Sequence, residues 1–417
     1  MKDAPFPARG SYADGFEPVA RIFAAQLASG EERGAAFAVY QHGRRVVHLW
    51  GGDAHAPRGR AWEPDTRVVV YSVTKGLAAM GLALLADRGR LAWDAPVASA
   101  WPAFAARGKE RVTFRDLFNH RAGLAVLDER FSLAECADPA TRPRLVAALA
   151  GQRPRGAQQA YHATTFGMYA SEVFELLAGE PLGPFLTREL FAPLGADVAL
   201  GTSPEDDARV ATVFEPSMRE RAVAMARAGL ARLRGEAHGP WTEGRIARAL
   251  LARDSLVRGA FGNPRVGRGI ASYARPSIWR APLAWASATG TADGIARAYL
   301  PFALGGEVDG RRYLRASTIA PVFERQGWSE RDGVLHKPLG WSQGFLKEQT
   351  HLFSPMRESF GHAGLGGSLG WCDPVRGLTI GYVMNRLDWR TRSPRALALT
   401  HALEACEPIR AARFTSG

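Results

Sequence analysis

The spacing of apolar residues along the chain predicts where its first helix and strands lie. A helix is indicated by apolar residues at helical spacing, namely Phe16, Val19, Ile22, Phe23 and Leu27. Residues 35–40 and 45–50 are predicted to form two strands, because both are short apolar runs that flank the turn signal His42-Gly43. The chain is therefore expected to begin with a helix followed by a β-hairpin.

Strand-like patterns return near the C-terminus, after a stretch rich in helices and turns. This stretch covers about residues 91–284 and includes a helix end with a turn at 116–124. Four late segments have the length and composition of strands, and these are 344–347, 358–362, 368–372 and 378–384. Residues 373–377 are predicted to form a turn, and helices are expected at 291–304 and 396–406.

Strands at both ends of the sequence, with helices between them, predict a discontinuous domain and an insertion. Residues 1–90 and 285–417 are expected to form an α/β (α+β) domain, and residues 91–284 an inserted all-helical domain. A chain of 417 residues is long enough for one large domain or two with a substantial core.

The most informative segment is residues 68–77, where an apolar run leads to Ser72 and Lys75 follows. The chain then continues as a helix that is apolar on almost all sides and ends at Asp87-Arg88-Gly89. A helix that is apolar all round is normally buried. Ser72 and Lys75 are therefore expected at the N-terminal tip of a central helix, on one face because of their spacing.

Such a placement suits nucleophilic catalysis. A serine hydroxyl is a weak nucleophile and needs a neighbouring group to accept its proton. Burial or a nearby positive charge favours the neutral amine of a lysine such as Lys75. The free amides and the dipole of a helix N-terminus also favour an oxyanion. The Ser-x-x-Lys pattern alone is weak, because it occurs by chance about 0.2 times in a chain this poor in lysine.

Two later segments are candidates to complete the site. Tyr161 is a candidate general base, because a phenol near two cations can lose its proton, although an isolated tyrosine is more often a packing residue. In residues 361–368, small residues around His362 leave backbone amides open to a substrate, as an oxyanion site requires. A strand with glycine bulges is the simpler interpretation of this second segment.

Together these segments resemble the serine β-lactamase and penicillin-binding-protein superfamily. Within that superfamily the chain is most similar to family VIII carboxylesterases and related esterases with a β-lactamase domain. The resemblance extends over nearly the whole chain and includes residues 71–75, 118–124, 161–167, 288–292, 339–341 and 361–367.

The resemblance implies a β-lactamase/transpeptidase-like fold, which is an antiparallel sheet flanked by helices plus an all-helical domain. It also implies roles for individual residues. Ser72 would be the nucleophile that becomes acylated, and Lys75 would assist its deprotonation. Tyr161 would act as base in acylation and then return the proton to the leaving alcohol. The amides of Ser72 and Leu365 would form the oxyanion hole.

Two departures from the β-lactamase pattern bear on the substrate. Ala163 stands where β-lactamases have an asparagine, and His362-Ala363-Gly364 stands where they have Lys-Thr-Gly. An anionic β-lactam or peptide would lose both its amide and its cation partners. The chain is therefore expected to be a serine carboxylesterase for short-chain or uncharged esters, with Leu365, His362 and Gly364 at the substrate.

Several alternatives use the same residues differently. An acyltransferase would pass the acyl group to an alcohol or amine, a weak β-lactamase would open lactams, and a non-catalytic member would only bind. Residues 366–370 also match Gly-x-Ser-x-Gly, the nucleophile elbow of α/β-hydrolases, around Ser368. That elbow requires a helix after the serine, whereas a strand is predicted here, so Ser368 is interpreted as a lining residue.

The net charge of +12 does not by itself indicate a nucleic-acid partner. The basic residues are mostly arginines scattered among acids, since the only lysines are Lys2, Lys75, Lys109, Lys337 and Lys347. Residues 219–234 form the densest basic stretch. We interpret this stretch as a solvated helix face in preference to a nucleic-acid or membrane surface.

Location and cofactors are predicted from what the sequence lacks. No N-terminal leader pattern and no apolar run of membrane-spanning length is present. The three cysteines, Cys136, Cys372 and Cys406, are widely separated, which is typical of a reducing compartment. We expect a cytoplasmic protein without metal or cofactor, whose partner is a small-molecule ester. The oligomeric state is not indicated.

Overall fold

The fold is described from a computed structural model of the chain. The structure describes residues 1–3, 7–55, 59–156, 159–235, 242–267, 269–347, 352–390 and 392–412.

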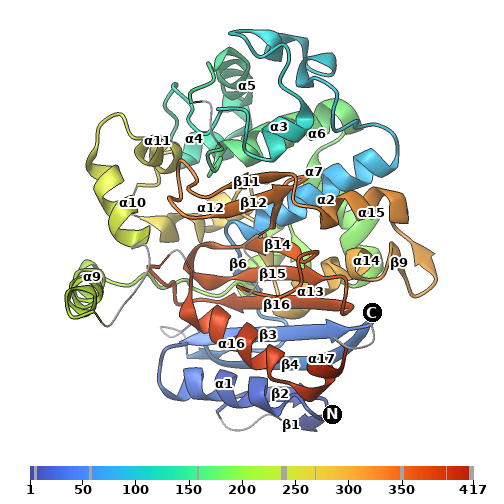
Figure 1. Ribbon diagram of the computed structural model, residues 1–417, viewed down its shortest axis with the longest axis vertical. Coiled ribbons are helices and arrows are strands. Elements are labelled where there is room, and N and C mark those ends of the chain that lie inside the picture. Colours follow the sequence, from blue (N-terminus) through green and yellow to red (C-terminus); the bar gives the residue numbers. More distant parts are fainter. Residues whose placement is uncertain are drawn as a thin grey trace.

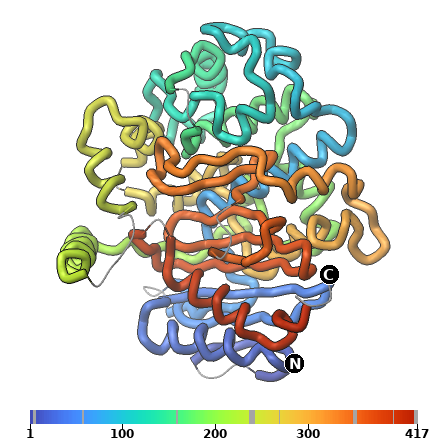
Figure 2. Tube along the Cα trace, in the orientation of Figure 1, coloured from blue at the N-terminus to red at the C-terminus, as the bar shows by residue number. Residues whose placement is uncertain are grey.

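An 11-stranded antiparallel sheet forms the centre of the protein, in the order β1-β2-β4-β3-β16-β15-β14-β13-β12-β11, with β5 paired to β4. Its strands are β1 (Lys2–Asp3), β2 (Arg9–Tyr12), β3 (Gly34–Gln41), β4 (Arg44–His55), β5 (Arg60–Ala61), β11 (Gly327–Ser329), β12 (Leu339–Ser342), β13 (Phe345–Lys347), β14 (Phe360–Ala363), β15 (Leu369–Asp373) and β16 (Leu378–Met384). Figure 2 shows the N-terminal strands directly beside the C-terminal ones.

Two small sheets complete the strand pairing. The first has the order β6-β8-β7 and the second pairs β9 with β10. Their strands are β6 (Val68–Val69), β7 (Val198–Ala199), β8 (Thr289–Gly290), β9 (Glu307–Val308) and β10 (Arg311–Arg312).

Helices cover both faces of the large sheet and fill the middle of the chain (Figure 1). They are α1 (Glu17–Ala28), α2 (Val73–Asp87), α3 (Phe114–Phe118), α4 (Leu133–Ala137), α5 (Arg142–Gly151), α6 (Thr165–Ala178), α7 (Leu182–Leu186), α8 (Ala192–Leu194), α9 (Met218–Leu233), α10 (Thr242–Leu251), α11 (Leu256–Gly262), α12 (Pro276–Trp279), α13 (Ala292–Ala298), α14 (Leu300–Ala303), α15 (Ala316–Phe323), α16 (Pro394–Glu404) and α17 (Glu407–Ala411).

The α/β class and the early and late strands predicted from the sequence are confirmed. The predicted hairpin is β3 and β4, and the predicted strand at 378–384 is β16, which pairs along its whole length with β3. The sheet therefore joins strands from both predicted α/β segments. The division of the chain at residues 91 and 285 into two domains stays a prediction.

Two details of the prediction were wrong. The helix expected at 291–304 is divided at Tyr299 into α13 and α14, where Pro301 occupies the first turn of the second helix. Strands β11 and β12 were not predicted. Each is only a few residues long and lacks an alternating apolar pattern, so its pairing with a neighbour decides its structure.

The helix α2 passes through the interior, as its sequence predicts. Every residue from Val73 to Leu85 is buried. It packs against α6 and against β14 of the sheet. The close approach requires glycine at two positions, because a side chain on Gly81 would collide with Leu182 and one on Gly76 with Tyr299. The N-terminus of α2 is thereby fixed against the sheet.

Candidate active site

Ser72 occupies the N-cap position of α2, directly after a strained turn. Tyr71 before it has a positive φ of 48°, which is unusual for a bulky residue. The Tyr71 ring is buried and packs edge-on against Tyr273, so the surrounding structure holds this conformation. The Ser72 hydroxyl makes no capping bond to the helix and is available for chemistry.

The structure brings Ser72, Lys75 and Tyr161 together. The Lys75 Nζ and the Tyr161 Oη each lie 3.1 Å from the Ser72 Oγ. Lys75 also donates to the carbonyl oxygen of Trp285 at 2.9 Å, which fixes the direction of its amine. A hydroxyl thus lies within hydrogen-bonding distance of two groups that can move its proton.

Burial favours the neutral amine of Lys75. Its side chain is fully buried, and no carboxylate in the described part of the chain raises its pKa. Desolvation holds the pKa of the Lys75 amine well below its usual value. A neutral amine beside Ser72 can accept the hydroxyl proton.

Burial favours the neutral phenol of Tyr161, whereas the sequence context suggested a phenolate. Burial raises the pKa of Tyr161, and this effect is larger than the lowering by the Ser72 hydrogen bond and by the charge of Arg392. A buried phenolate would lose more stabilisation from water than the neighbouring hydrogen bond and charge restore. Tyr161 is therefore placed to donate a proton, and Lys75 to accept one.

The ring of Tyr161 is held by residues whose role the sequence did not reveal. It stacks on Trp341 of β12, with ring centroids 5.6 Å apart and planes at 8°. The Asp332 carboxylate accepts from the Tyr161 backbone N–H at 3.1 Å. His120 packs against both rings, with its centroid 5.2 Å from that of Tyr161 and 4.0 Å from that of Trp341. Trp341 and His120 lie in segments that carried the family resemblance, which was the available signal.

A turn at 365–367 lies next to the nucleophile and presents amides. Gly364 must lack a side chain, because a Cβ there would lie 2.4 Å from the Val70 oxygen, in the segment that leads to Ser72. Gly366 and Gly367 have φ of 84° and 127°, which favour glycine. In the described part of the chain, the Leu365 amide donates to no other protein group. These features suit an oxyanion site.

His362 lies on β14 beside the site but carries no charge. It is buried, and its Nδ1 is 2.8 Å from the Ala363 oxygen. Burial, with a smaller effect from Lys75, lowers the pKa of His362 to about 3. His362 is thus a neutral group where β-lactamases have a lysine in the motif. Ala163 is buried and offers no polar side chain.

The structure excludes a nucleophile elbow at Ser368. The Ser368 Oγ is buried and donates to the Val70 carbonyl oxygen at 2.9 Å. A strand, β15, follows Ser368 directly, whereas the elbow requires a helix. Ser368 therefore supports the turn below Ser72 and does not compete with it.

Among the described residues, no group of three or more His, Cys, Asp or Glu side chains is arranged to hold a metal ion. None of the described helices is long and apolar enough to cross a membrane.

The neutral state of His362 predicts a pH-dependent stability. Because its pKa is lower in the folded than in the unfolded protein, the unfolded chain takes up the proton first as pH falls below 6.5. Between pH 7.5 and 5.5 the wild type should therefore lose about 1.4 kcal/mol more stability than His362→Gln. Urea unfolding of both proteins at both pH values measures this difference. An equal loss would mean that the pKa of His362 is not lowered in the folded protein.

Comparisons with known proteins agree with this geometry. A sequence profile of the beta-lactamase family matches residues 19–404. The chain is 33% identical over 374 residues to esterase/beta-lactamase LipL of Mycobacterium tuberculosis, which covers 89% of this chain and 81% of that protein.

Solved structures show the same fold. A family VIII carboxylesterase superposes with a TM-score of 0.82 and 32% identity, over 96% of this chain and 100% of that one. A penicillin-binding protein homologue from Caulobacter crescentus superposes with a TM-score of 0.80 and 31% identity, over 96% of this chain and 99% of that one.

Proposed function

We propose that this chain, which belongs to the beta-lactamase family, cleaves short-chain or uncharged carboxylic esters through an acyl-enzyme on Ser72. Its similarity to esterases over most of its length makes it a serine carboxylesterase of the β-lactamase type. One observation supports the assignment of residues above all others: Lys75 Nζ and Tyr161 Oη both lie 3.1 Å from Ser72 Oγ.

Acylation begins with the neutral amine of Lys75. It accepts the Ser72 proton while Oγ attacks the ester carbonyl carbon. The tetrahedral oxyanion accepts hydrogen bonds from the amides of Ser72 and Leu365, which are aided by the N-terminus of α2. The Tyr161 phenol then donates its proton to the alcohol oxygen as the C–O bond breaks, and the proton held by Lys75 restores the phenol.

Deacylation repeats these steps with water. Water attacks the acyl carbon, its proton passes to the Lys75 amine, and the second tetrahedral oxyanion uses the same two amides. Collapse returns a proton to Ser72 and releases the carboxylic acid. Acyl transfer to an added alcohol would follow the same route with the alcohol in place of water, and product analysis with an alcohol present tests it.

The neutral His362 supports an uncharged substrate. A β-lactam or peptide carboxylate would meet an uncharged imidazole at this position, so it gains no ion pair there. Small neutral esters do not need one. We therefore expect higher kcat/KM for neutral esters than for esters of the same size that carry a carboxylate.

Covalent labelling tests the nucleophile. A fluorophosphonate should modify Ser72, and mass mapping of the labelled peptide identifies the position. Ser72→Ala should abolish the label, whereas Ser368→Ala, which removes a buried hydroxyl bonded to Val70, should keep it. A label that disappears in Ser368→Ala and persists in Ser72→Ala would overturn the assignment.

A further inference from the structure

The helix α9 differs from the rest of the fold, because none of its 16 residues is buried. It begins with a capping box in which Ser217 and Glu220 bond reciprocally to each other's backbone amides, so its start is well defined. Figure 1 shows it at the edge of the molecule, away from the large sheet. A surface helix normally buries one apolar face, and α9 does not.

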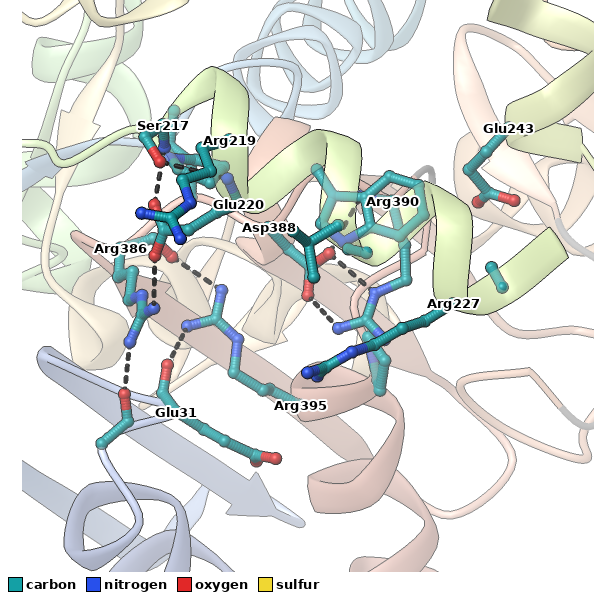
Figure 3. Close-up of a pocket in the computed structure, with 18 of the residues that line it drawn as sticks. Glu31, Ser217, Arg219, Glu220, Arg227, Glu243, Arg386, Asp388, Arg390 and Arg395 are labelled. Carbon is teal, nitrogen blue, oxygen red and sulfur yellow. Dashed lines mark hydrogen bonds and ion pairs between the residues drawn. The ribbon is translucent and has the colours of Figure 1, made fainter. Parts of the chain in front are cut away.

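Polar contacts connect α9 to the rest of the protein. Glu220 lies 3.4 Å from Arg386, and Arg221 pairs with Glu215 at 2.7 Å. Between α9 and residues 386–390, 394 and 395 lies an open trough with a volume of about 1140 Å³. Figure 3 shows charged side chains along this trough. The inner side of α9 therefore faces an open trough with charged and apolar lining residues, and not the core.

The outer side of α9 carries large apolar side chains. Their exposed fractions are 79% for Met218, 46% for Leu230 and 87% for Leu233, and none of the three lines the trough. At roughly 100° per residue these three positions fall within an arc of about 120° on the helix. We call this arc the outer strip of α9. An exposed apolar strip of this width is typical of a contact surface.

Positive charge accompanies the outer strip. The helix and its C-cap carry Arg219, Arg221, Arg227, Arg232 and Arg234, against a single acid, Glu220. On the same projection Arg219 falls within the strip, and Arg234 and Arg227 fall beside it; Arg219 and Arg227 also line the trough, at the border between its lining and the strip. The surface thus combines apolar side chains with cationic ones.

This combination selects among possible occupants. A second copy of the chain would bring two α9 helices together and place their arginines against each other, which is unfavourable. A nucleic acid would bind the arginines through its phosphates but would leave the leucines in water. An anionic lipid surface suits both the apolar and the cationic side chains, because its acyl chains cover the apolar strip and its headgroups pair with the arginines.

We propose that α9 lies on an anionic lipid surface through its outer strip, with its arginines at the lipid headgroups. This replaces the interpretation of residues 219–234 as a merely solvated helix face. The proposal is independent of the reaction at Ser72. It concerns a helix lying in the interface and not one crossing a membrane.

The segment behind α9 connects the docking face to the active site. The Asp388 amide and the Arg395 guanidinium both donate to the Gly366 oxygen, at 3.0 and 3.1 Å. Gly366 belongs to the turn that contains the Leu365 amide. Residues 386–390, 394 and 395 also line the trough beneath α9. This segment therefore lies between α9, which would contact the lipid, and the turn that contains the Leu365 amide.

Co-sedimentation of the full chain with vesicles tests the proposal. One set of vesicles contains phosphatidylcholine alone, and the other contains roughly one third phosphatidylglycerol. We expect at least tenfold stronger binding to the anionic vesicles. The double variant Leu230→Ser/Leu233→Ser should weaken that binding at least tenfold, and Arg219→Gln/Arg227→Gln about fivefold for each arginine removed.

A matched control separates the strip from general surface apolarity. Leu176 on α6 is 47% exposed, which is nearly the same exposed fraction as that of Leu230, but it does not belong to the outer strip. Leu176→Ser should therefore leave vesicle binding unchanged. Turnover of a small water-soluble ester should stay the same in every variant, which also reports that they fold. Absence of anionic vesicle binding, or binding that the leucine variant retains, would overturn the proposal. The proposal would also be overturned if the chain sedimented as a dimer that only the leucine variant dissociates. Binding to RNA and not to vesicles would overturn it as well.

Discussion

Lys75→Met is expected to lower kcat/KM for a neutral ester by about three to four orders of magnitude while the protein stays folded. Methionine fills nearly the same space as lysine but cannot accept the Ser72 proton. The amine that it replaces is fully buried and lies 3.1 Å from the Ser72 hydroxyl. Steady-state kinetics on purified wild type and variant measure the effect.

Stability should change in the opposite direction to activity. The pKa of Lys75 is well below its ordinary value in the folded protein, whereas the unfolded chain holds the proton at neutral pH. The buried amine therefore costs stability below its unfolded pKa of about 10.4, and this cost shrinks as pH rises. Lys75→Met removes this desolvation cost, but it also removes the hydrogen bond to the Trp285 oxygen. We therefore expect the unfolding free energy of the variant at pH 7 to be equal to or above that of the wild type.

Lys109 provides the matched control. It is also fully buried, but its amine donates to three backbone oxygens, of Ala106, Ala150 and Gln152, at 2.6 to 2.8 Å. Lys109→Met should lower the melting temperature because these oxygens lose their donor, while the folded fraction keeps its turnover. If Lys75→Met retained turnover near the wild-type level, Lys75 would not be the base.

The central helix and its chemistry could be predicted because both depend on local sequence. A run of apolar residues on every side of α2 marks a buried helix, and the spacing of Ser72 and Lys75 puts them on one face. Strand β16 was predicted with its observed bounds for the same reason, since all seven of its residues are buried and apolar or small.

The surroundings of Tyr161 could not be predicted, because they come from segments far away in the sequence. Trp341 and Asp332 reach it from the β11–β12 region, where the sequence has no strong strand pattern. The protonation state of Tyr161 depends on how completely those segments bury it. Sequence indicates neighbouring cations but not the extent of desolvation, so the neutral phenol emerges only from the structure.

The outer strip of α9 is a further case in which sequence alone was insufficient. Alternating arginine and apolar residues in 218–233 fit an ordinary amphipathic surface helix. Only the structure tells which side faces the protein, and here Met218, Leu230 and Leu233 face outward, whereas Val223 lines the trough.

Tyr161→Phe is expected to lower turnover by about two to four orders of magnitude, with a loss that depends on the leaving group. The variant keeps the ring that stacks on Trp341, so the site should keep its shape. It loses the proton that the leaving alcohol requires. An alkyl ester, whose alkoxide leaves poorly, should therefore lose far more activity than the nitrophenyl ester of the same acid, whose phenolate leaves unprotonated. Parallel kcat/KM measurements on the two esters give this ratio.

Tyr273→Phe is the control for removing a nearby buried phenol. The Tyr273 Oη accepts from the Trp285 indole at 3.0 Å and makes no bond to Ser72, so this variant should stay within a few-fold of wild type on both esters. Equal losses on the two esters in Tyr161→Phe would contradict the role in leaving-group protonation. They would assign the phenol to an earlier step, because attack by Ser72 is common to both substrates whereas departure of the alcohol is not. The ratio between the esters thus separates the donor role proposed for Tyr161 from the base role proposed for Lys75.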